Sequence, residues 1–516
     1  MNMGRLLARH ARYRPDDYAV ICGGHRFTFR AHELRVHRLA NALAMLGLVK
    51  GDTIAVVLPN CVELLETYRA AALLGLVAVP LSPLMRGTGL ATLLRDADAA
   101  VVIAGEGLAD ALREVRAELA LPADRYILTG PSPDFRSYAD FLEGSTEGAP
   151  PDVEIEGDHP FNIIYSSGTT GQPKGIVLTH HTRALYGTMF ANAFRFTPES
   201  VVMHAGSLVF NGAFVTLMPA WYLGCRYILQ EKFDAELFIE TVRRERVTHV
   251  MMVPSQIVAV LNAPGFSHEA LASLRMLCSV GAPWHREHKE KFLRVLPDAL
   301  YELYGLTEGF ITILDSADFE AHLDSVGVPI PFSEMRVVGE NGRDLPAGEA
   351  GEIVGRSPLL MSGYHKRPDL TAQALVDGWL YTGDVGYADD GGFLHLVDRK
   401  KDMIISGGVN VFPKDIEEIA VQHAEVREVA VFGVPDRKWG ESPMAAVVLK
   451  ERTDLSVSAG ELRSWINARV AARFQQVFEV VIVDDLPRST AGKTLKRVLR
   501  DEYASRGNTS ESKATA

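Results

Sequence analysis

The first 160 residues repeat one pattern, in which residues with apolar side chains at helical spacing alternate with short apolar runs rich in β-branched residues. Helical stretches and apolar runs alternate in the order 31–46, 53–58, 61–74, 77–79, 99–103 and 125–128. Strands that alternate with helices form parallel sheets covered by helices. The pattern predicts an α/β fold with a large N-terminal domain of parallel-type sheets.

The pattern changes beyond Gly327, where short β runs are separated by Gly-rich turns. This pattern of short strands and turns predicts a small antiparallel or β-barrel-like subdomain. From residue 401 strands again alternate with helices, over a length that suits a small mobile α+β domain. We therefore predict an N-terminal domain at 1–400, a C-terminal domain at 401–504 and a polar, disordered tail at 505–516.

Length and composition fit this division. A chain of 516 residues is too long for one core, and 47% hydrophobic and 23% charged residues are ordinary for a globular protein. The net charge of −12 argues against a nucleic-acid partner. The four cysteines form no Cys-x-x-Cys pair, so we expect buried thiols in a reducing compartment. No signal-peptide core or membrane span is present in the sequence, which predicts a cytoplasmic protein.

One segment is dense in glycines and hydroxyl side chains. Tyr165-Ser-Ser-Gly-Thr-Thr-Gly-Gln-Pro-Lys-Gly175 follows an apolar run that reads as a buried strand. Glycines let backbone N–H groups turn toward an anion, hydroxyls add donors and a lysine adds charge. The segment predicts a phosphate-holding loop without the common P-loop spacing. A flexible linker is the alternative, but it would not lie between two apolar runs.

Two further turns follow apolar strands. Met276–Val280 leads into Gly281-Ala-Pro283, and residues 299–304 lead into Gly305, with Thr307 and Glu308 directly after it. Open α/β sheets bind ligands at the carboxyl ends of strands. A carboxylate beside a phosphate site indicates a cation between them, so Glu308 is a candidate Mg²⁺ ligand. A cap of the next helix is the alternative role for Glu308.

The paired histidines His180 and His181 invite a metal hypothesis. No third ligand stands at useful spacing, so we predict a capping or surface role.

Five motifs in order resemble those of the adenylate-forming superfamily, in its acyl-CoA synthetase branch. They are the loop at 165–175, Tyr304-Gly-x-Thr-Glu308, Tyr381-Thr-Gly-Asp384, the segment 398–410 and Leu486-Pro-Arg-Ser-Thr-Ala-Gly-Lys493. The resemblance implies that ATP converts a carboxylic acid to an acyl-adenylate with release of pyrophosphate, and that a thiol then takes the acyl group. A non-catalytic nucleotide-binding paralogue is the alternative from another class, against which the intact Glu308, Asp384 and Lys493 argue.

The resemblance also assigns residues to ATP. It implies catalytic roles for Lys493, Thr307 and Glu308, with Glu308 holding Mg²⁺, and a hinge at Lys401. The implied ATP and AMP contacts are Ser166, Ser167, Gly168, Thr169, Thr170, Gly171, Lys174, Gly281, Ala282, Pro283, Glu302, Leu303, Tyr304, Gly305, Asp384 and Arg399.

The acceptor follows from the segment after the hinge. Gly407 and Gly408 resemble the glycine pair that lines a pantetheine channel, and Arg437, Lys438 and Trp439 suit a nucleotide. We therefore expect coenzyme A as the acceptor, with a carrier-protein thiol as the alternative. The chain would act as a monomer or homodimer.

The acid site departs from many relatives, which have a histidine where this chain has Phe210 or a neighbouring residue. Phe210, Asn211 and Phe214, with Gly281 and Gly305, predict a roomy apolar pocket. It suits a medium- or long-chain, aromatic or alicyclic acid.

Overall fold

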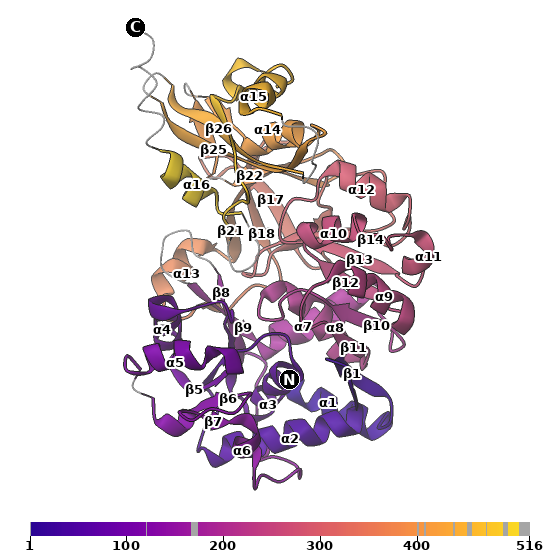
Figure 1. The fold of residues 1–516 in the computed structure, drawn as a ribbon, viewed down its shortest axis with the longest axis vertical. Helices are drawn as coiled ribbons and strands as arrows, with labels where there is room; N and C mark the ends of the chain where they lie inside the picture. The colour runs from indigo at the N-terminus through magenta and orange to yellow at the C-terminus, as the bar shows by residue number, and fades with distance from the viewer. Residues whose placement is uncertain are drawn as a thin grey trace. The chain divides into compact units, whose positions relative to one another are not determined.

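The computed structural model describes residues 2–119, 121–166, 174–399, 402–406, 409–436, 439–450, 457–470, 472–488 and 494–504. The chain divides into two compact units (Figure 1). Unit 1 comprises Met1–Glu334 and Gly355–Leu380, and unit 2 comprises Met335–Val354 and Tyr381–Ala516. The predicted hinge at Lys401 and the tail at 505–516 lie outside the described residues, and the boundary at 401 stays a prediction.

The first sheet of unit 1 contains eight strands among the described residues, in the order β19-β9-β8-β4-β3-β5-β6-β7. Its strands β3, β4, β5 and β6 are paired in parallel, as the alternation of helices and apolar runs predicts. The strand bounds are β3 Thr53–Val57, β4 Val77–Pro80, β5 Ala99–Ala104, β6 Tyr126–Leu128, β7 Arg136–Ser137, β8 Pro160–Ser166, β9 Lys174–Thr179 and β19 Gly363–Tyr364.

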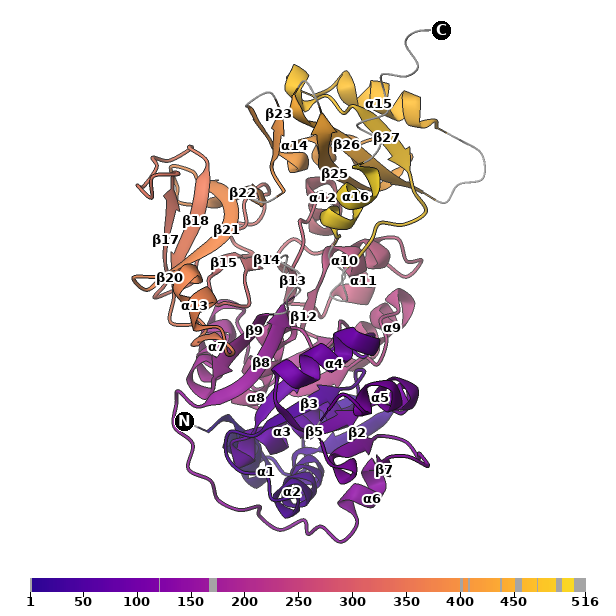
Figure 2. The ribbon, with the colours of Figure 1, turned by 90° about the vertical axis from the view of Figure 1, so that its left-hand side faces the viewer.

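Helices cover both faces of this sheet, as Figure 2 shows for α4 and α5 in front of β3 and β5. The side chains of β3 alternate between two hydrophobic clusters. Ile54 and Val56 belong to one buried cluster, and Ala55 and Val57 belong to the other. A strand buried on both faces reads as a continuous apolar run, because alternate side chains enter different cores. This is why residues 53–58 show no polar alternation.

The second sheet of unit 1 has the order β16-β15-β14-β13-β12-β10-β11-β1-β2 within the described residues. Strands β10 to β14 and β1 are paired in parallel, whereas β15, β16 and β2 are antiparallel additions at the two ends. The bounds are β1 Tyr18–Cys22, β2 His25–Thr28, β10 Val201–His204, β11 Arg226–Leu229, β12 His249–Met252, β13 Met276–Val280, β14 Leu300–Gly305, β15 Ile311–Leu314 and β16 Val328–Pro329.

Local capping interactions explain where helices of unit 1 begin and end. α2 begins after Thr28, whose hydroxyl accepts from Ala31 N at 3.2 Å, and α3 ends at Gly75 with φ of 67°. The helix bounds are η1 Met3–Arg5, α1 Leu6–Tyr13, α2 Phe29–Met45, α3 Val62–Leu74, α4 Gly87–Asp96, η2 Glu106–Leu108, α5 Ala109–Arg116, η3 Ala123–Arg125, α6 Tyr138–Leu142, α7 His180–Ala193, η4 Asn211–Ala213, α8 Phe214–Leu223, α9 Ala235–Glu245, α10 Pro254–Leu261, α11 His268–Leu271, α12 Arg286–Leu293 and α13 Pro368–Ala374.

The paired histidines lie at the start of α7. Thr179 caps this helix, since its hydroxyl accepts from Thr182 N at 3.1 Å. His180 is completely buried, and its Nδ1 accepts from Met3 N at 3.2 Å. The predicted capping or surface role is therefore wrong for His180. Among the residues with described positions, no cluster of histidine, cysteine and carboxylate side chains could hold a metal ion.

The remaining strands form two smaller sheets, of which the second lies within unit 2. The first has the order β17-β18-β21-β20 with β22 beside β21, and the second has the order β24-β23-β26-β25 with β27 beside β26. Helix α15 begins with a capping box, in which Ser458 Oγ accepts from Glu461 N at 3.2 Å. The bounds are β17 Glu334–Val338, β18 Gly351–Arg356, β20 Leu375–Val376, β21 Trp379–Ala388, β22 Leu394–Arg399, β23 Ile404–Ser406, β24 Val409–Val411, α14 Pro413–Ala420, β25 Val426–Asp436, β26 Gly440–Leu449, α15 Ala459–Asn467, η5 Arg473–Gln475, β27 Glu479–Ile482 and α16 Lys496–Tyr503.

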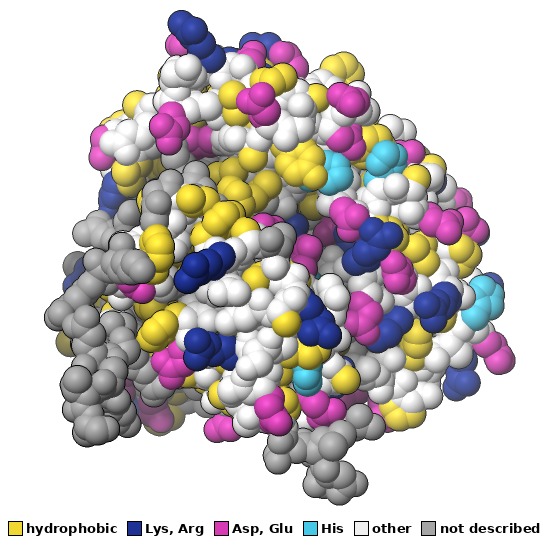
Figure 3. Space-filling model, turned by 90° about the horizontal axis from the view of Figure 1, so that it is seen from above, with side chains coloured by type: hydrophobic (Ala, Val, Ile, Leu, Met, Phe, Trp, Pro, Cys, Tyr) yellow, Lys and Arg dark blue, Asp and Glu magenta, His cyan; other side chains and the backbone are white. Residues whose placement is uncertain are grey.

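The surface carries both charge signs. On the face shown in Figure 3, lysine and arginine side chains are interspersed with aspartate and glutamate side chains. Within the described ranges, none of the helices combines the length and the apolar character that crossing a bilayer requires.

Three of the buried histidines of unit 1 illustrate the pH dependence of its stability. Burial lowers the pKa of His180 to about 3 and the pKa values of His204 and His249 to about 4. Below pH 6.5 the unfolded chain binds protons that the folded chain does not, so stability falls as the pH drops toward 4. Each histidine should cost about 2 kcal/mol of unfolding free energy at pH 5, relative to pH 7.

Urea unfolding of unit 1 at pH 7 and pH 5 measures this loss. The His249→Gln variant removes one titrating group and should show a smaller loss than the wild type. An unfolding free energy that stays constant between pH 7 and pH 5 would contradict the prediction.

Candidate active site

The candidate site of unit 1 forms where β13 and β14 end side by side. The two strands are paired in parallel, with Ser279 opposite Glu302 and Val280 opposite Leu303. Gly281–Pro283 therefore leaves the sheet beside Leu303–Gly305, which brings together two segments predicted to contact the nucleotide. Gly281 has φ of 93°, a conformation that favours glycine at the turn.

The side chain of Glu302, another predicted contact, points elsewhere. It is 5% exposed and forms a buried ion pair with Lys289 of α12. Lys289 Nζ also donates to Leu323 O at 2.6 Å. The Glu302 carboxylate thus ties α12 to β14, so its predicted contribution to the site would come from its backbone.

Glu308 lies in a turn between two strands. Gly309 N donates to Leu306 O at 3.0 Å, and β15 follows from Ile311, so the helix-cap alternative for Glu308 is wrong. Gly309 has φ of 112°, and a Cβ atom there would lie only 2.1 Å from Leu359 O. This close approach of two backbones fixes the turn that presents Glu308.

Tyr364 connects Glu308 with the phosphate-loop lysine. Its hydroxyl donates to Glu308 Oε1 at 2.8 Å, and Lys174 Nζ lies 5.2 Å from the centroid of its ring. Burial, followed by the neighbouring Glu308 charge, raises the pKa of Tyr364 well above its usual value, so the hydroxyl stays a donor. Tyr364 was not predicted as a site residue, because its only local signal in the sequence is the Gly363-Tyr364 pair before a Pro-initiated helix.

Backbone pairing holds Tyr364 in place. The short strand β19 pairs with β9 in antiparallel fashion, with Tyr364 opposite Ile176, and His365 N donates to Gly175 O at 2.6 Å. Lys174 begins β9, so the same pairing fixes both partners. Glu308, Lys174 and Tyr364 therefore converge from three distant parts of the sequence.

Most of the predicted phosphate loop lies outside the described residues. Ser166 ends β8, opposite Lys174 in the antiparallel pairing of β8 with β9. Ser167, Gly168, Thr169, Thr170 and Gly171 lie outside the described residues, so their predicted contacts are not placed.

Three of the predicted acid-pocket residues lie around η4: Phe210 precedes it, Asn211 begins it and Phe214 begins α8. A Cβ atom added to Gly212 would lie 3.4 Å from Met251 Cε and 3.7 Å from Val280 Cγ1, which places η4 beside the ends of β12 and β13. Phe210 is half-buried, whereas Phe214 is completely buried. Phe214 packs against Tyr68 with ring centroids 5.5 Å apart, so it belongs to the wall of the core.

Unit 2 holds the predicted ribose contacts. Asp384 of β21 lies opposite Arg399 of β22 in the antiparallel pairing, which places the two predicted residues side by side. Asp384 is 9% exposed, and its N–H donates to Thr382 Oγ1 at 3.1 Å. Gly383 has φ of 71°, as the turn-like backbone before Asp384 requires.

The predicted thiol-acceptor residues are described only in part. Trp439 lies in the turn between β25 and β26, is 45% exposed, and its N–H donates to Asp436 Oδ1 at 3.0 Å. Gly407, Gly408, Arg437, Lys438 and Lys493 lie outside the described residues.

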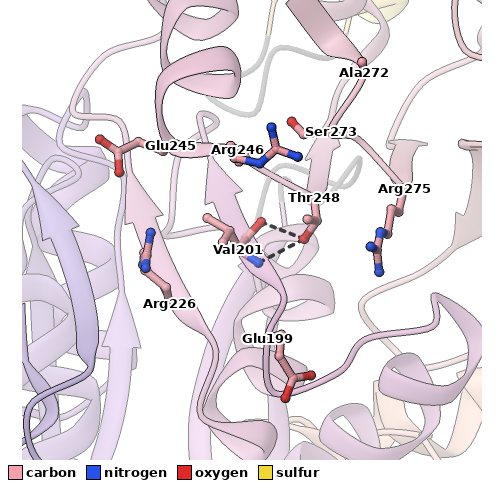
Figure 4. A pocket seen from close by; sticks show the side chains of 9 residues that line it. All are labelled: Glu199, Val201, Arg226, Glu245, Arg246, Thr248, Ala272, Ser273 and Arg275. Atoms are coloured by element: carbon pink, nitrogen blue, oxygen red, sulfur yellow. Dashed lines mark hydrogen bonds between the residues drawn. The ribbon is translucent and has the colours of Figure 1, made fainter.

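Two surface pockets lie at the opposite edge of the second sheet. One of about 410 Å³ is lined by residues that precede or begin β10 to β13, and it includes Thr248, whose hydroxyl accepts from Val201 N at 2.9 Å (Figure 4). A neighbouring one of about 480 Å³ shares Arg275 with it. Neither contains a predicted site residue, and both lie at the amino ends of the strands, where ligands of such sheets do not bind.

Comparison with known proteins decides the family. The model of the AMP-binding enzyme family matches residues 7–365, and that of the AMP-binding enzyme C-terminal domain matches residues 415–493. The chain belongs to the AMP-binding enzyme family. The predicted membership of the adenylate-forming superfamily, in its acyl-CoA synthetase branch, is confirmed.

Relatives match this AMP-binding enzyme along its length. A feruloyl-CoA synthase of Amycolatopsis sp is 35% identical over 510 residues, which cover 97% of this chain and 99% of the relative. The long-chain-fatty-acid–CoA ligase FadD13 of Mycobacterium tuberculosis is 32% identical and covers 98% and 99% of the two chains. ATP-bound MatB from Rhodopseudomonas palustris has the same fold, with a TM-score of 0.89 at 29% identity over 98% and 100% of the chains. The predicted enzyme class, an AMP-forming acid–thiol ligase, is confirmed.

The contact between Tyr364 and Glu308 gives a testable prediction for this AMP-binding enzyme. The Tyr364→Phe variant keeps the ring beside Lys174 but loses the donor to Glu308. A hydrogen bond to a charged group contributes about 1.5–3 kcal/mol, so kcat/KM for ATP should fall about 10- to 100-fold. ATP–pyrophosphate exchange, measured over a range of Mg²⁺ concentrations, would show this loss.

The exposed tyrosine Tyr18 provides the control, since it is 40% exposed and lies in β1. Tyr18→Phe should keep wild-type exchange. Equal exchange by Tyr364→Phe and Tyr18→Phe would show that the Tyr364 hydroxyl does not support the site.

Proposed function

We propose that this ligase activates an apolar carboxylic acid, whether medium- or long-chain, aromatic or alicyclic, and transfers the acyl group to coenzyme A. The observation that carries the proposal is the convergence of Glu308, Tyr364 and Lys174 at the carboxyl-end edge of parallel strands. The half-buried Phe210 and the buried Phe214 beside that edge support an apolar acid. A feruloyl-CoA synthase and a long-chain-fatty-acid–CoA ligase among the relatives agree with this range of acids.

In the first half-reaction, a carboxylate oxygen of the acid attacks the α-phosphorus of ATP, and the bond from that phosphorus to the bridging oxygen breaks. Pyrophosphate leaves and an acyl-adenylate remains. Such chemistry requires positioning and charge neutralisation. In our proposal Ser166–Gly171 and Lys174 hold the β- and γ-phosphates, and Gly281–Pro283 with Leu303–Tyr304 encloses the adenine.

Glu308 fits the role of a magnesium ligand. Mg²⁺ in nucleotide sites is bound by one or two carboxylates together with phosphate oxygens, and it neutralises charge on the phosphates. Glu308 is a half-buried carboxylate, and Tyr364 orients it through Oε1. The neighbouring Thr307 supplies a hydroxyl in the same turn.

We assign the ribose contacts, the catalytic lysine and the coenzyme A contacts to residues of unit 2. Asp384 and Arg399 hold the ribose, and Lys493 stabilises the negative charge that develops between the acid and the α-phosphate. Rotation at Lys401 then removes Lys493 and admits coenzyme A, along a channel lined by Gly407 and Gly408. Arg437, Lys438 and Trp439 bind its nucleotide portion, and the exposure of Trp439 supports this.

AMP release tests the proposed acid and acceptor. ATP and Mg²⁺ would be supplied with acetate, octanoate, palmitate, benzoate, cinnamates or cyclic acids, with and without coenzyme A. We expect coenzyme A-dependent AMP release with one apolar group of acids and little with acetate. Adenylate formation that ignores coenzyme A would favour a carrier-protein thiol, and no AMP with any acid would contradict the proposal.

The role of Lys493 separates the two half-reactions. The Lys493→Ala variant should lose adenylate formation by two or more orders of magnitude, yet it should still form thioester from a supplied acyl-adenylate. Lys496 begins α16 and pairs with Glu417 at 2.8 Å, so Lys496→Ala is a matched nearby control that should retain both activities. Equal loss of both half-reactions in Lys493→Ala would overturn this assignment.

A further inference from the structure

Arg183 of α7 is a fully buried arginine with an incomplete set of contacts. Its Nε donates to Asn162 Oδ1 on β8 at 3.0 Å. Its guanidinium carbon lies 4.0 Å from the centroid of the Phe214 ring and 4.9 Å from that of Tyr186. Among the described residues, neither Nη1 nor Nη2 has a hydrogen-bond partner, and Arg183 has no ion pair. Burying a cation without an anion costs free energy because the charge loses its hydration. A hydrogen-bond acceptor beside the guanidinium would offset part of that cost.

Two buried amides share this condition, and they are linked to Arg183 either directly, as Asn162 is, or through Tyr186, as Asn211 is. Asn211 Nδ2 donates to Tyr186 OH at 3.3 Å, which joins η4 to α7. Asn211 Oδ1 and Asn162 Nδ2 are buried without a partner in the parts of the chain that the structure describes. Asn162, Arg183, Tyr186 and Asn211, which we name the Arg183 cluster, thus present three unused donor atoms and one unused acceptor atom.

The Arg183 cluster adjoins the proposed acid pocket. Asn211 belongs to both, and Phe214, on whose ring Arg183 stacks, is one of the predicted pocket residues. The next residue, Gly212, lies beside Met251 and Val280 at the ends of β12 and β13. The cluster therefore includes part of η4, the segment that approaches the site where the acid would be activated, and its other residues come from α7 and β8.

A second buried arginine shows that burial and stacking alone do not indicate a ligand. Arg69 of α3 is 3% exposed, lies 4.0 Å from the centroid of the Trp221 ring, and has Nε and Nη1 without partners among the described residues. Within those residues, no hydrogen bond, ion pair or ring contact joins Arg69 to Asn211 or Phe214. Arg183 differs because its cluster includes residues of the proposed pocket.

We infer that the Arg183 cluster binds an acceptor oxygen at the end of the acid remote from the carboxyl group that is activated. This inference rests on the proposed function and narrows its substrate class. The outer nitrogens of a guanidinium match the two oxygens of a carboxylate, and a phenolic oxygen can accept from the same donors. The substrate then has an apolar body between two oxygen-bearing ends.

Matched pairs of acids test the inference. Octanedioate is compared with octanoate, and 4-hydroxycinnamate with cinnamate, by the kcat/KM of AMP formation. The wild type should prefer the member with the remote oxygen in one pair by about 10- to 100-fold, because a site with buried unpaired donors rejects the analogue that lacks the acceptor. The pair that shows the preference identifies a carboxylate or a phenolic oxygen.

The Arg183→Met variant removes the charge and keeps much of the side-chain volume. It should lose the preference, chiefly through a higher KM for the oxygen-bearing acid. Arg69→Met is the control, since it removes a buried, ring-stacked arginine outside the cluster. It should lower the melting temperature and leave the preference unchanged.

The outcomes separate this inference from the proposed function. If no acid of any kind is activated by the wild type, the proposed function fails and this inference fails with it. If apolar acids are activated but neither pair shows a preference, only the inference is overturned, and this result does not require any variant to fold. A preference that survives in folded Arg183→Met, as judged by melting and ATP binding, would also overturn it.

Discussion

Parallel pairing of β13 with β14 is the constraint on which the site depends. Parallel strands place all their carboxyl ends at one edge, so segments that are far apart in the sequence leave the sheet as neighbours. The register of Val280 opposite Leu303 brings Gly281–Pro283 beside Tyr304 and Gly305. The same edge receives η4, through the contact of Gly212 with Met251 and Val280. Burial of both faces by helices fixes this register, because a slip by one residue would exchange the two cores.

The sequence could predict those features that depend on local pattern. The strands that end at Val280 and Gly305, the capping box at Ser458 and the turn glycine before Asp384 each have a local cause, and each is present in the structure. The family follows from motifs whose order is itself a strong signal. These features required no knowledge of which strand lies beside which.

Features that depend on long-range packing could not be predicted. The N-terminal strand β1 pairs with β11, with Val20 opposite Tyr227, and nothing near Val20 indicates that partner. Tyr364 reaches Glu308 only because β19 pairs with β9. His180 looks like a surface residue beside a second histidine, yet packing buries it completely. In each case the decisive contact lies more than 50 residues away in the sequence.

Arg183 changes how the apolar pocket should be understood. Aromatic residues predict an apolar acid from composition alone, and Phe210 and Phe214 agree with that reading. A buried guanidinium behind Phe214 adds a requirement that composition does not reveal, because removing a cation from water must be offset by a partner. Its bond to Asn162 and its stacking on Phe214 offset part of that cost, and they leave two nitrogens that have no hydrogen-bond partner among the described residues. An acid with an oxygen at its far end would offset the rest of this desolvation cost. The contact between that oxygen and the Arg183 guanidinium would then contribute both to the affinity for the acid and to the specificity among acids.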